Sequence, residues 1–156
     1  MSDTLSATVD LLDGMAFRAT SGTGHVVVMD AAPEVGGDDS GGRPMEMLLL
    51  GLGGCTGMDV ISMLRKMRQD VSSYQIRLRG ERASEHPKIF TAITVEHVVR
   101  GRALGLEAVK RAVELSATRY CSAAAMLGRA AHIEETLRII DESTGQEQTG
   151  ALALAA

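Results

Sequence analysis

Residues 44–66, PMEMLLLGLGGCTGMDVISMLRK, form the longest apolar stretch of the chain and decide its fold. Pro44 suits the first turn of a helix, where its missing N–H group removes no hydrogen bond. Seven residues then recur at three- and four-residue spacing, which places them on one helix face: Leu48, Gly51, Leu52, Cys55, Met58, Asp59 and Ser62. The stretch predicts a central helix that begins at Pro44 and ends near Gln69.

Three glycines, Gly51, Gly53 and Gly54, stand just before Cys55 in this predicted helix. Each weakens a helix interior by about 1 kcal/mol relative to alanine. A helix that keeps all three must gain stability elsewhere, and close approach of another backbone is the usual gain. We therefore expect tight packing at the glycines, with the Cys55 thiol at the crossing point.

Composition and charge restrict the classes of protein that fit. The 156 residues suggest one domain; they are 45% hydrophobic and 3% aromatic with nine methionines, so the core must be aliphatic and Met-rich. A net charge of −4 without a basic patch argues against nucleic acid as a partner. The apolar stretch is long enough to span a membrane, but its carboxylates and glycines favour a core helix. The N-terminal sequence lacks a signal-peptide pattern, so we expect a cytoplasmic protein without a membrane partner.

The sequence before the central helix predicts a small antiparallel sheet. Residues 4–12 and 15–20 read as two strands around a hairpin turn at residues 13–14, and the β-branched run at residues 25–29 is a third. Residues 31–43 are rich in Gly, Pro and Asp, and are expected to form a flexible connector to the helix.

The sequence after the central helix predicts a long hairpin, a helix and a strand. Residues 71–82 alternate apolar and polar side chains and pair with residues 88–100 as a hairpin with one solvent-exposed face. Residues 104–119 return to helical spacing. Residues 130–141 fit both spacings, and their Thr and Ile content favours a strand.

The strands gather in runs instead of alternating with helices. This order predicts an α+β fold with antiparallel sheets. We expect a single domain over residues 1–141, followed by a frayed C-terminal tail over residues 142–156.

The two cysteines, Cys55 and Cys121, have two interpretations. Both lie in apolar settings, and free cysteines are often buried core thiols. In the cytoplasm, however, a cysteine pair is more often catalytic or redox-active than structural. A peroxidatic thiolate with a second thiol that traps its sulfenic acid is the sharper interpretation.

The segment from Pro44 to Cys55, with Cys121 in a Tyr-Cys-small-residue setting, resembles the OsmC/Ohr family. The resemblance extends over residues 4–140. It implies a cytoplasmic homodimer that intertwines, with antiparallel sheets wrapped around two central helices packed back to back. It also implies that Cys55 is the peroxidatic cysteine and Cys121 the resolving one, and that organic hydroperoxides are reduced to alcohols without a metal or an organic cofactor. The partner would be an external dithiol, such as that of a lipoyl protein.

The resemblance also implies an arginine and a glutamate at the site. Arg18 is the first candidate for the arginine; Arg43 is the alternative, and Arg119 has no assigned role. Family members carry a glutamate directly after the helix-starting proline, whereas here Met45 stands there and Glu46 follows. Glu46 lies roughly 180° around an ideal helix from the thiol. Its alternative role is a favourable charge at the helix N-terminus.

Asp59 lies one turn after Cys55, and a nearby carboxylate disfavours a thiolate. The GGCT…D pattern resembles a less-characterised OsmC-like branch. An OsmC-like dimer that binds a small apolar or thiol-reactive ligand without turnover is therefore the alternative function.

The histidines add no metal motif. They are scattered along the chain, without the spacing of a zinc site: His25, His86, His97 and His132. A hydrolase with a Cys–His pair stays open because such partners meet only in space. His97 is expected on the solvent-exposed face of its strand.

Overall fold

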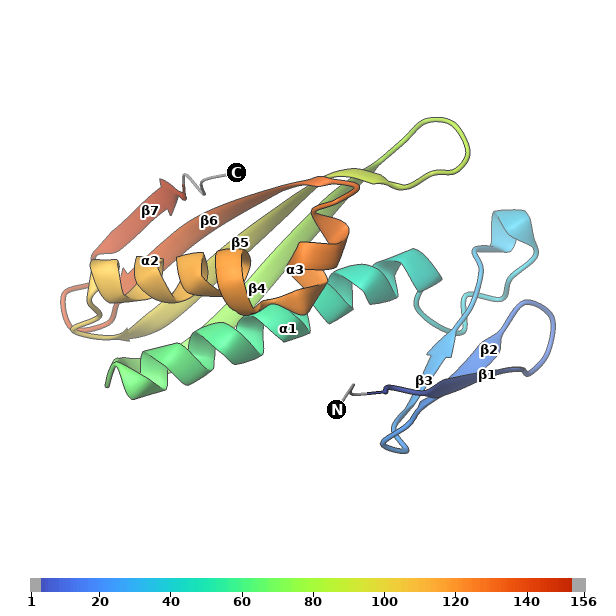
Figure 1. Ribbon diagram of the computed structural model, residues 1–156, viewed down its shortest axis with the longest axis horizontal. Helices are drawn as coiled ribbons and strands as arrows, with labels where there is room; N and C mark the ends of the chain where they lie inside the picture. The colour runs from blue at the N-terminus through green and yellow to red at the C-terminus, as the bar shows by residue number, and fades with distance from the viewer. Residues whose placement is uncertain (1–3, 153–156) are drawn as a thin grey trace. The chain divides into compact units, whose positions relative to one another are not determined.

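The computed structural model describes residues 4–152 and has an α+β architecture (Figure 1). The chain folds into two compact units, Met1–Leu48 and Leu49–Ala156. Helix α1 (Pro44–Lys66) starts in the first unit and contributes most of its length to the second. The α+β fold class is thus confirmed, and the assignment of residues 1–141 to one domain stays a prediction.

The N-terminal unit is an antiparallel meander, as its hairpin signals predict. Its strands β1 (Ala7–Leu11), β2 (Phe17–Ser21) and β3 (Val26–Met29) pair in chain order. The loop that follows contains one short 3-10 turn, η1 (Pro33–Val35).

The connector between β3 and α1 is organised around a carboxylate, although the sequence predicted a flexible segment. Asp30 accepts hydrogen bonds from the amides of Ala31 (2.7 Å), Asp38 (3.0 Å) and Ser40 (3.0 Å), and from the Ser40 hydroxyl (2.8 Å). The hydrogen bond from the Ser40 amide, supported by the other donors, lowers the pKa of Asp30 from 3.8 to about 2. A Gly- and Asp-rich loop is therefore held in one arrangement by its first acidic residue.

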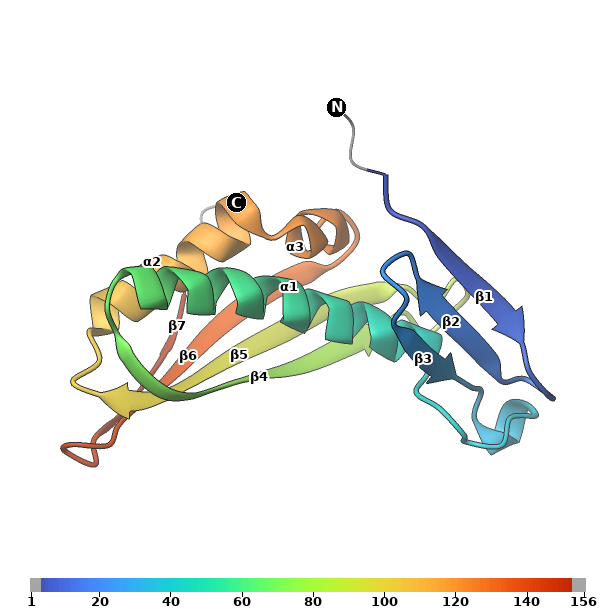
Figure 2. The same ribbon diagram turned by 90° about the horizontal axis from the view of Figure 1, so that it is seen from below.

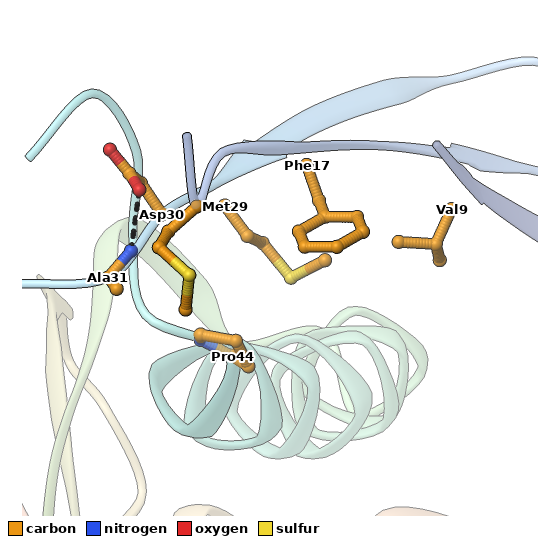
Figure 3. A pocket seen from close by; sticks show the side chains of 7 residues that line it. Val9, Phe17, Met29, Asp30, Ala31 and Pro44 are labelled. Atoms are coloured by element: carbon orange, nitrogen blue, oxygen red, sulfur yellow. Dashed lines mark hydrogen bonds between the residues drawn. The ribbon is translucent and has the colours of Figure 1, made fainter. Parts of the chain in front are cut away.

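A shallow apolar pocket of about 270 Å³ lies in this N-terminal unit. Its lining combines side chains of the sheet and the connector: Val9, Met15, Phe17, Met29, Asp30, Ala31 and Pro44 (Figure 3). The Asp30 carboxylate turns toward the connector, where the Ala31 amide donates to it. The pocket therefore offers apolar surface but no nucleophile.

The C-terminal unit is built on a four-stranded mixed sheet in the order β4-β5-β6-β7. Its strands are β4 (Asp70–Arg82), β5 (Phe90–Arg102), β6 (His132–Asp141) and β7 (Glu147–Ala151). The β4–β5 and β6–β7 pairs are antiparallel, as expected, but β5 and β6 are parallel. The predicted antiparallel pairing does not extend to β5 and β6, because a helical crossover joins them and such a connection returns the chain in the same direction.

The expected frayed tail is also partly wrong. Within it, β7 pairs with β6 through a tight turn in which the Asp141 amide donates to the Gln146 carbonyl at 2.9 Å. Asp141 also accepts hydrogen bonds from the Ser143 side chain and amide, which lower the pKa of its carboxyl group. The last residues of the tail, 153–156, lie outside the described residues.

Helices cover one face of this sheet (Figure 2). Helix α2 (Leu106–Leu115) runs into a five-residue π-helical turn, η2 (Ser116–Tyr120), and then into α3 (Ser122–Leu127). An aliphatic cluster fills the core between α1, α2 and the sheet: Val60, Leu64, Val99, Val109, Ala112, Val113, Leu137 and Ile139. The opposite face is polar and carries the Arg77–Glu96 ion pair, so the prediction of one solvent-exposed face is confirmed.

The glycines of α1 divide into two groups. A Cβ atom on Gly53 would lie 2.8 Å from Leu78 Cδ1, and one on Gly57 would lie 2.8 Å from Ile76 Cδ1. These two glycines let α1 approach β4 closely; of the three glycines for which the sequence predicted tight packing, only Gly53 shows it within the chain. Gly51 and Gly54, in contrast, have no atom within 4 Å of such a position. Close packing within the chain therefore explains only half of the glycine pattern.

Much of α1 remains exposed in the single chain. Only 28% of its most apolar window is buried, and within residues 4–152 it is the one helix whose length and composition would allow a membrane span. The residues that are buried face the sheet, as in a core helix: Leu52, Gly53, Thr56, Val60 and Leu64. The expected cytoplasmic location stays a prediction.

A polar network lies buried beneath the helices. His97 Nε2 is 2.7 Å from Glu135 Oε2, and both side chains are almost fully buried, at 0% and 1% exposure. The Tyr74 hydroxyl is 2.6 Å from His97 Nδ1. Burial, with the Glu135 charge nearby, raises the pKa of Tyr74, so its hydroxyl keeps its proton and can donate to His97. The expectation that His97 faces solvent is wrong, because its side chain shares the helix-covered face with Val95 and Val99.

Replacing Glu135 with alanine is expected to destabilise the fold by about 1–3 kcal/mol, because the His97 Nε2–H group would stay buried without its acceptor. Urea unfolding followed by circular dichroism measures this loss. Glu134→Ala is the matched control: Glu134 is exposed on the same strand, so its loss should stay within about 0.5 kcal/mol. Equal losses in the two variants would contradict a stabilising role for the pair.

Candidate functional site

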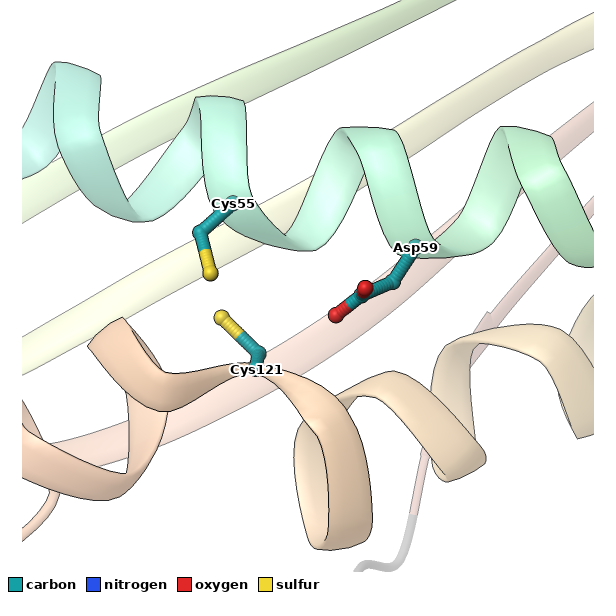
Figure 4. Close-up of side chains that lie close together, drawn as sticks. All are labelled: Cys55, Asp59 and Cys121. Carbon is teal, nitrogen blue, oxygen red and sulfur yellow. The ribbon is translucent and has the colours of Figure 1, made fainter. Parts of the chain in front are cut away.

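The two cysteines meet between α1 and the start of α3 (Figure 4). Cys55 lies in the middle of α1, and Cys121 lies at the N-cap of α3, directly after the π-helical turn. Asp59 follows Cys55 by one helical turn. The two sulfur atoms and a carboxylate oxygen of Asp59 all lie within 4.8 Å of one another. Residues far apart in sequence thus form one cluster of two thiols and one carboxylate.

The π-helical turn and the cap position determine where Cys121 points. The Cys121 amide donates to the Ser116 carbonyl at 2.9 Å, which ends the turn. The Cys121 sulfur accepts from the Ala124 amide at 3.4 Å and so caps α3. In Figure 4 this places the sulfur toward Cys55.

The two thiols have different environments. Cys121 is 3% exposed, and this burial raises the pKa of its thiol from 9.0 to about 12, so it is protonated at neutral pH. Cys55 is half-buried and is the more accessible sulfur. An external electrophile would therefore reach Cys55 first, with the Cys121 thiol held beside it.

A short chain of hydroxyl groups holds Asp59. Ser116 Oγ donates to Asp59 Oδ2 at 3.1 Å, and Thr56 Oγ1 lies 3.0 Å from Ser116 Oγ. Because Ser116 gives its only hydroxyl proton to the carboxylate, it must accept from Thr56. Thr56 and Ser116 are both buried, so the carboxylate is held from the protein interior. The hydroxyl groups contact only its Oδ2 atom.

A cavity of about 370 Å³ begins at Asp59. Its wall is largely apolar, with one cation: Asp59, Ser62, Met63, Lys66, Met67, Leu115 and Tyr120. The cavity gives small molecules access to the edge of the cysteine cluster.

Two other candidates from the sequence, Glu46 and Arg43, act within the N-terminal unit. Glu46 Oε2 accepts from the Arg43 amide at 2.8 Å, the contact of a capping box at the start of α1. The sequence offered a favourable charge at the helix N-terminus as the alternative role, and the structure adds this capping contact. The Arg43 guanidinium contacts Asp39 and the carbonyl of Gly41. Both side chains are thus engaged in organising the helix start and the connector.

The remaining arginines have simple surroundings. Arg18 is exposed on β2, opposite Asp10 of β1 in the strand register. Arg119 lies over the ring of Tyr120, 5.4 Å from its centroid. Within the C-terminal unit, the described residues form no ion pair with Asp59.

Sequence reasoning missed Thr56 and Ser116. The available signal was a polar residue at a helical position that otherwise faces the core: Thr56 shares a face with Leu52 and Val60, and Ser116 follows Ala112 and Val113. Such residues need hydrogen-bond partners when buried. The pattern could have identified two buried hydroxyls but not the carboxylate that they bind.

Comparison with known proteins agrees with this architecture. The family model of OsmC-like proteins matches residues 37–136. Protein YhfA of Escherichia coli K12 is 40% identical over 136 residues, which are 87% of this chain and 98% of that protein. The crystal structure of a hypothetical protein from Aquifex aeolicus VF5 has a TM-score of 0.80 at 29% identity, with 90% of this chain and 99% of that chain covered.

More distant structures share the fold alone. An organic hydroperoxide resistance protein from Elizabethkingia anophelis has a TM-score of 0.64 at 14% identity, over 88% of this chain and 96% of that chain. The extent of the family-model match and the identity to YhfA show to which family this mixed sheet with its covering helices belongs. The chain belongs to the OsmC-like protein family.

Proposed function

We propose that this protein is a cysteine-based peroxidase that reduces organic hydroperoxides. The Cys55 thiolate attacks the O–O bond of the hydroperoxide, releases an alcohol and becomes a sulfenic acid. The Cys121 thiol then condenses with the sulfenic acid, which releases water and forms a disulfide. An external dithiol reduces this disulfide through a mixed-disulfide intermediate and restores both thiols.

The observation that carries the proposal is the pairing of an accessible thiol with a buried one. The sulfurs of Cys55 and Cys121 lie within 4.8 Å, close enough for a disulfide to form after modest side-chain rotation. The raised pKa of Cys121 suits a resolving cysteine, because its thiol stays protonated while Cys55 reacts with the peroxide. The largely apolar cavity beside Asp59 suits an organic hydroperoxide.

Asp59 is the residue at the site that opposes peroxidase activity. Its carboxylate lies beside both sulfurs, and a neighbouring negative charge disfavours a thiolate. The peroxidase therefore needs a cation at the site. We assign this role to Arg18, the arginine that the family resemblance offers first, since Arg43 already contacts Asp39 and Gly41.

Reduced protein mixed with cumene hydroperoxide in a stopped-flow instrument is expected to lose both of its thiols rapidly. Cys55→Ser should lose none, since the attacking sulfur is gone. Cys121→Ser should accumulate a sulfenic acid that dimedone labels, since nothing resolves it. A free-thiol count and mass spectrometry report each result.

Oxidation no faster than that of free cysteine would contradict the peroxidase. The proximity of Asp59 favours a second function in that case: an OsmC-like protein that binds a small apolar or thiol-reactive ligand without turnover. Retention of such a ligand in the cavity beside Asp59 would then be the activity to measure.

Arg18→Ala is expected to slow the oxidation of Cys55 on the order of 100-fold, because a charge that stabilises the thiolate and the transition state is removed. Arg77→Ala is the control, since Arg77 lies on the exposed outer face of the sheet and should leave the rate unchanged. The same stopped-flow assay measures both variants. Equal rates in Arg18→Ala and the wild type would remove Arg18 from the site.

We also propose that the protein acts as a homodimer through the exposed face of α1. Large apolar side chains on this face are open to solvent in the single chain, with Leu50 63% and Met58 73% exposed. Gly51 and Gly54 lie on the same face with open space above them. Glycines between exposed apolar side chains fit the close approach of a second helix, here α1 of a partner chain.

Gly54→Leu is expected to convert the dimer to a monomer, because the new side chain would occupy the space of the partner helix. In the single chain a Cβ atom at Gly54 has no atom within 4 Å, so we expect the variant to fold. Sedimentation velocity at micromolar concentration measures the mass, and Arg111→Leu on the exposed side of α2 is the control. A wild-type protein that sediments as a monomer would contradict the proposal.

A further inference from the structure

The cysteine cluster contains three potential ligand atoms and no neighbouring cation in an ion pair. The sulfurs of Cys55 and Cys121 and an oxygen of Asp59 lie within 4.8 Å of one another. Among residues 4–152, no Lys, Arg or His side chain forms an ion pair with Asp59. We propose that the reduced protein binds one thiophilic divalent cation, of the Zn²⁺ type, through Cys55, Asp59 and Cys121.

The donor set and its spacing fit such a cation. Zn²⁺ binds thiolate sulfur at about 2.3 Å and carboxylate oxygen at about 2.0–2.2 Å in a tetrahedral arrangement. Two sulfurs on one such ion lie roughly 3.8 Å apart. The observed upper limit of 4.8 Å requires only small side-chain rotations to reach that separation. Two sulfur ligands select a soft cation over Mg²⁺ or Ca²⁺.

The elements that hold the ligands are rigid. Cys55 and Asp59 are separated by one turn of the long helix α1, so they project from the same face. Cys121 is fixed by two hydrogen bonds, from its own amide to the Ser116 carbonyl and from the Ala124 amide to its sulfur. The cluster therefore does not depend on a mobile loop.

The carboxylate is oriented by a second layer of polar groups. Ser116 occupies Asp59 Oδ2, and Thr56 in turn donates to Ser116. Hydrogen bonds of this kind are what position metal ligands in proteins. Both hydroxyl residues are buried, with Thr56 1% and Ser116 0% exposed, so they orient Asp59 without contact with solvent.

Binding of the cation releases protons from the two thiols. Each thiol releases one proton to solvent as its sulfur coordinates the cation, and Asp59 binds as the carboxylate. The cavity at Asp59 provides an entry path, and a water molecule would complete the fourth position. A bound cation would occupy both sulfurs, so it would also block attack by Cys55 on a peroxide.

The test uses Co²⁺ as a spectroscopic probe, added anaerobically to the reduced full-length protein without peroxide. We expect one Co²⁺ per chain, with a sulfur-to-metal charge-transfer band and the visible bands of a tetrahedral ion, all removed by Zn²⁺. Asp59→Ala and Asp59→Asn should each weaken binding at least about tenfold, and Ser116→Ala about tenfold. Cys121→Ser should reduce the charge-transfer intensity.

Asp70→Asn is the control, because Asp70 pairs with Arg102 on the surface, and it should bind as the wild type does. A spectrum without the charge-transfer band, or binding unchanged by both Asp59 variants, would overturn the three-ligand site. Circular dichroism confirms that each variant is folded. Because no peroxide is present, the test is independent of the proposed peroxidase: Co²⁺ binding with slow thiol oxidation would reject only the peroxidase, and the reverse result would reject only the metal site.

Discussion

The close approach of α1 to β4 is the contact on which the C-terminal unit depends. Gly53 and Gly57 carry no side chain, so Leu78 and Ile76 fill the space that a Cβ atom would take. This contact fixes the rotation of α1 on the sheet, which turns Val60 and Leu64 into the aliphatic core. The same rotation leaves Cys55 at the side of the helix, where α3 delivers Cys121. The position of the site thus follows from the absence of two side chains.

Periodicity in the sequence was sufficient to predict most of the fold. The N-terminal meander, the long hairpin and α1 each carry a strong local pattern, and the structure has them close to the predicted residues. The parallel pairing of β5 with β6, and β7 in the expected tail, could not be predicted in the same way. Both depend on which strands meet after the helices have packed, and this information is not local to any segment.

The site was predictable to a similar degree. Two cysteines in apolar helical settings identified the thiols, and helical spacing placed Asp59 on the same face as Cys55. The sequence did not reveal that Ser116 binds Asp59, because the two residues come from different helices and meet only in the folded chain. His97 was assigned to the wrong face, although it alternates with the apolar Val95 and Val99. A histidine among such neighbours needs a buried hydrogen-bond partner, and the sequence pattern alone does not identify that partner as Glu135.

The buried pair of His97 and Glu135 also selects the alignment of two strands. The residues lie on β5 and β6, which are far apart along the chain and pair in parallel. A slip of β6 by one residue would turn Glu135 to the solvent side of the sheet and leave His97 enclosed without an acceptor. Aliphatic side chains tolerate such slips more easily, since one branched residue replaces another at similar volume. The hydrogen bond between His97 and Glu135 therefore discriminates against misaligned sheets that the Val- and Ile-rich strands would otherwise accept.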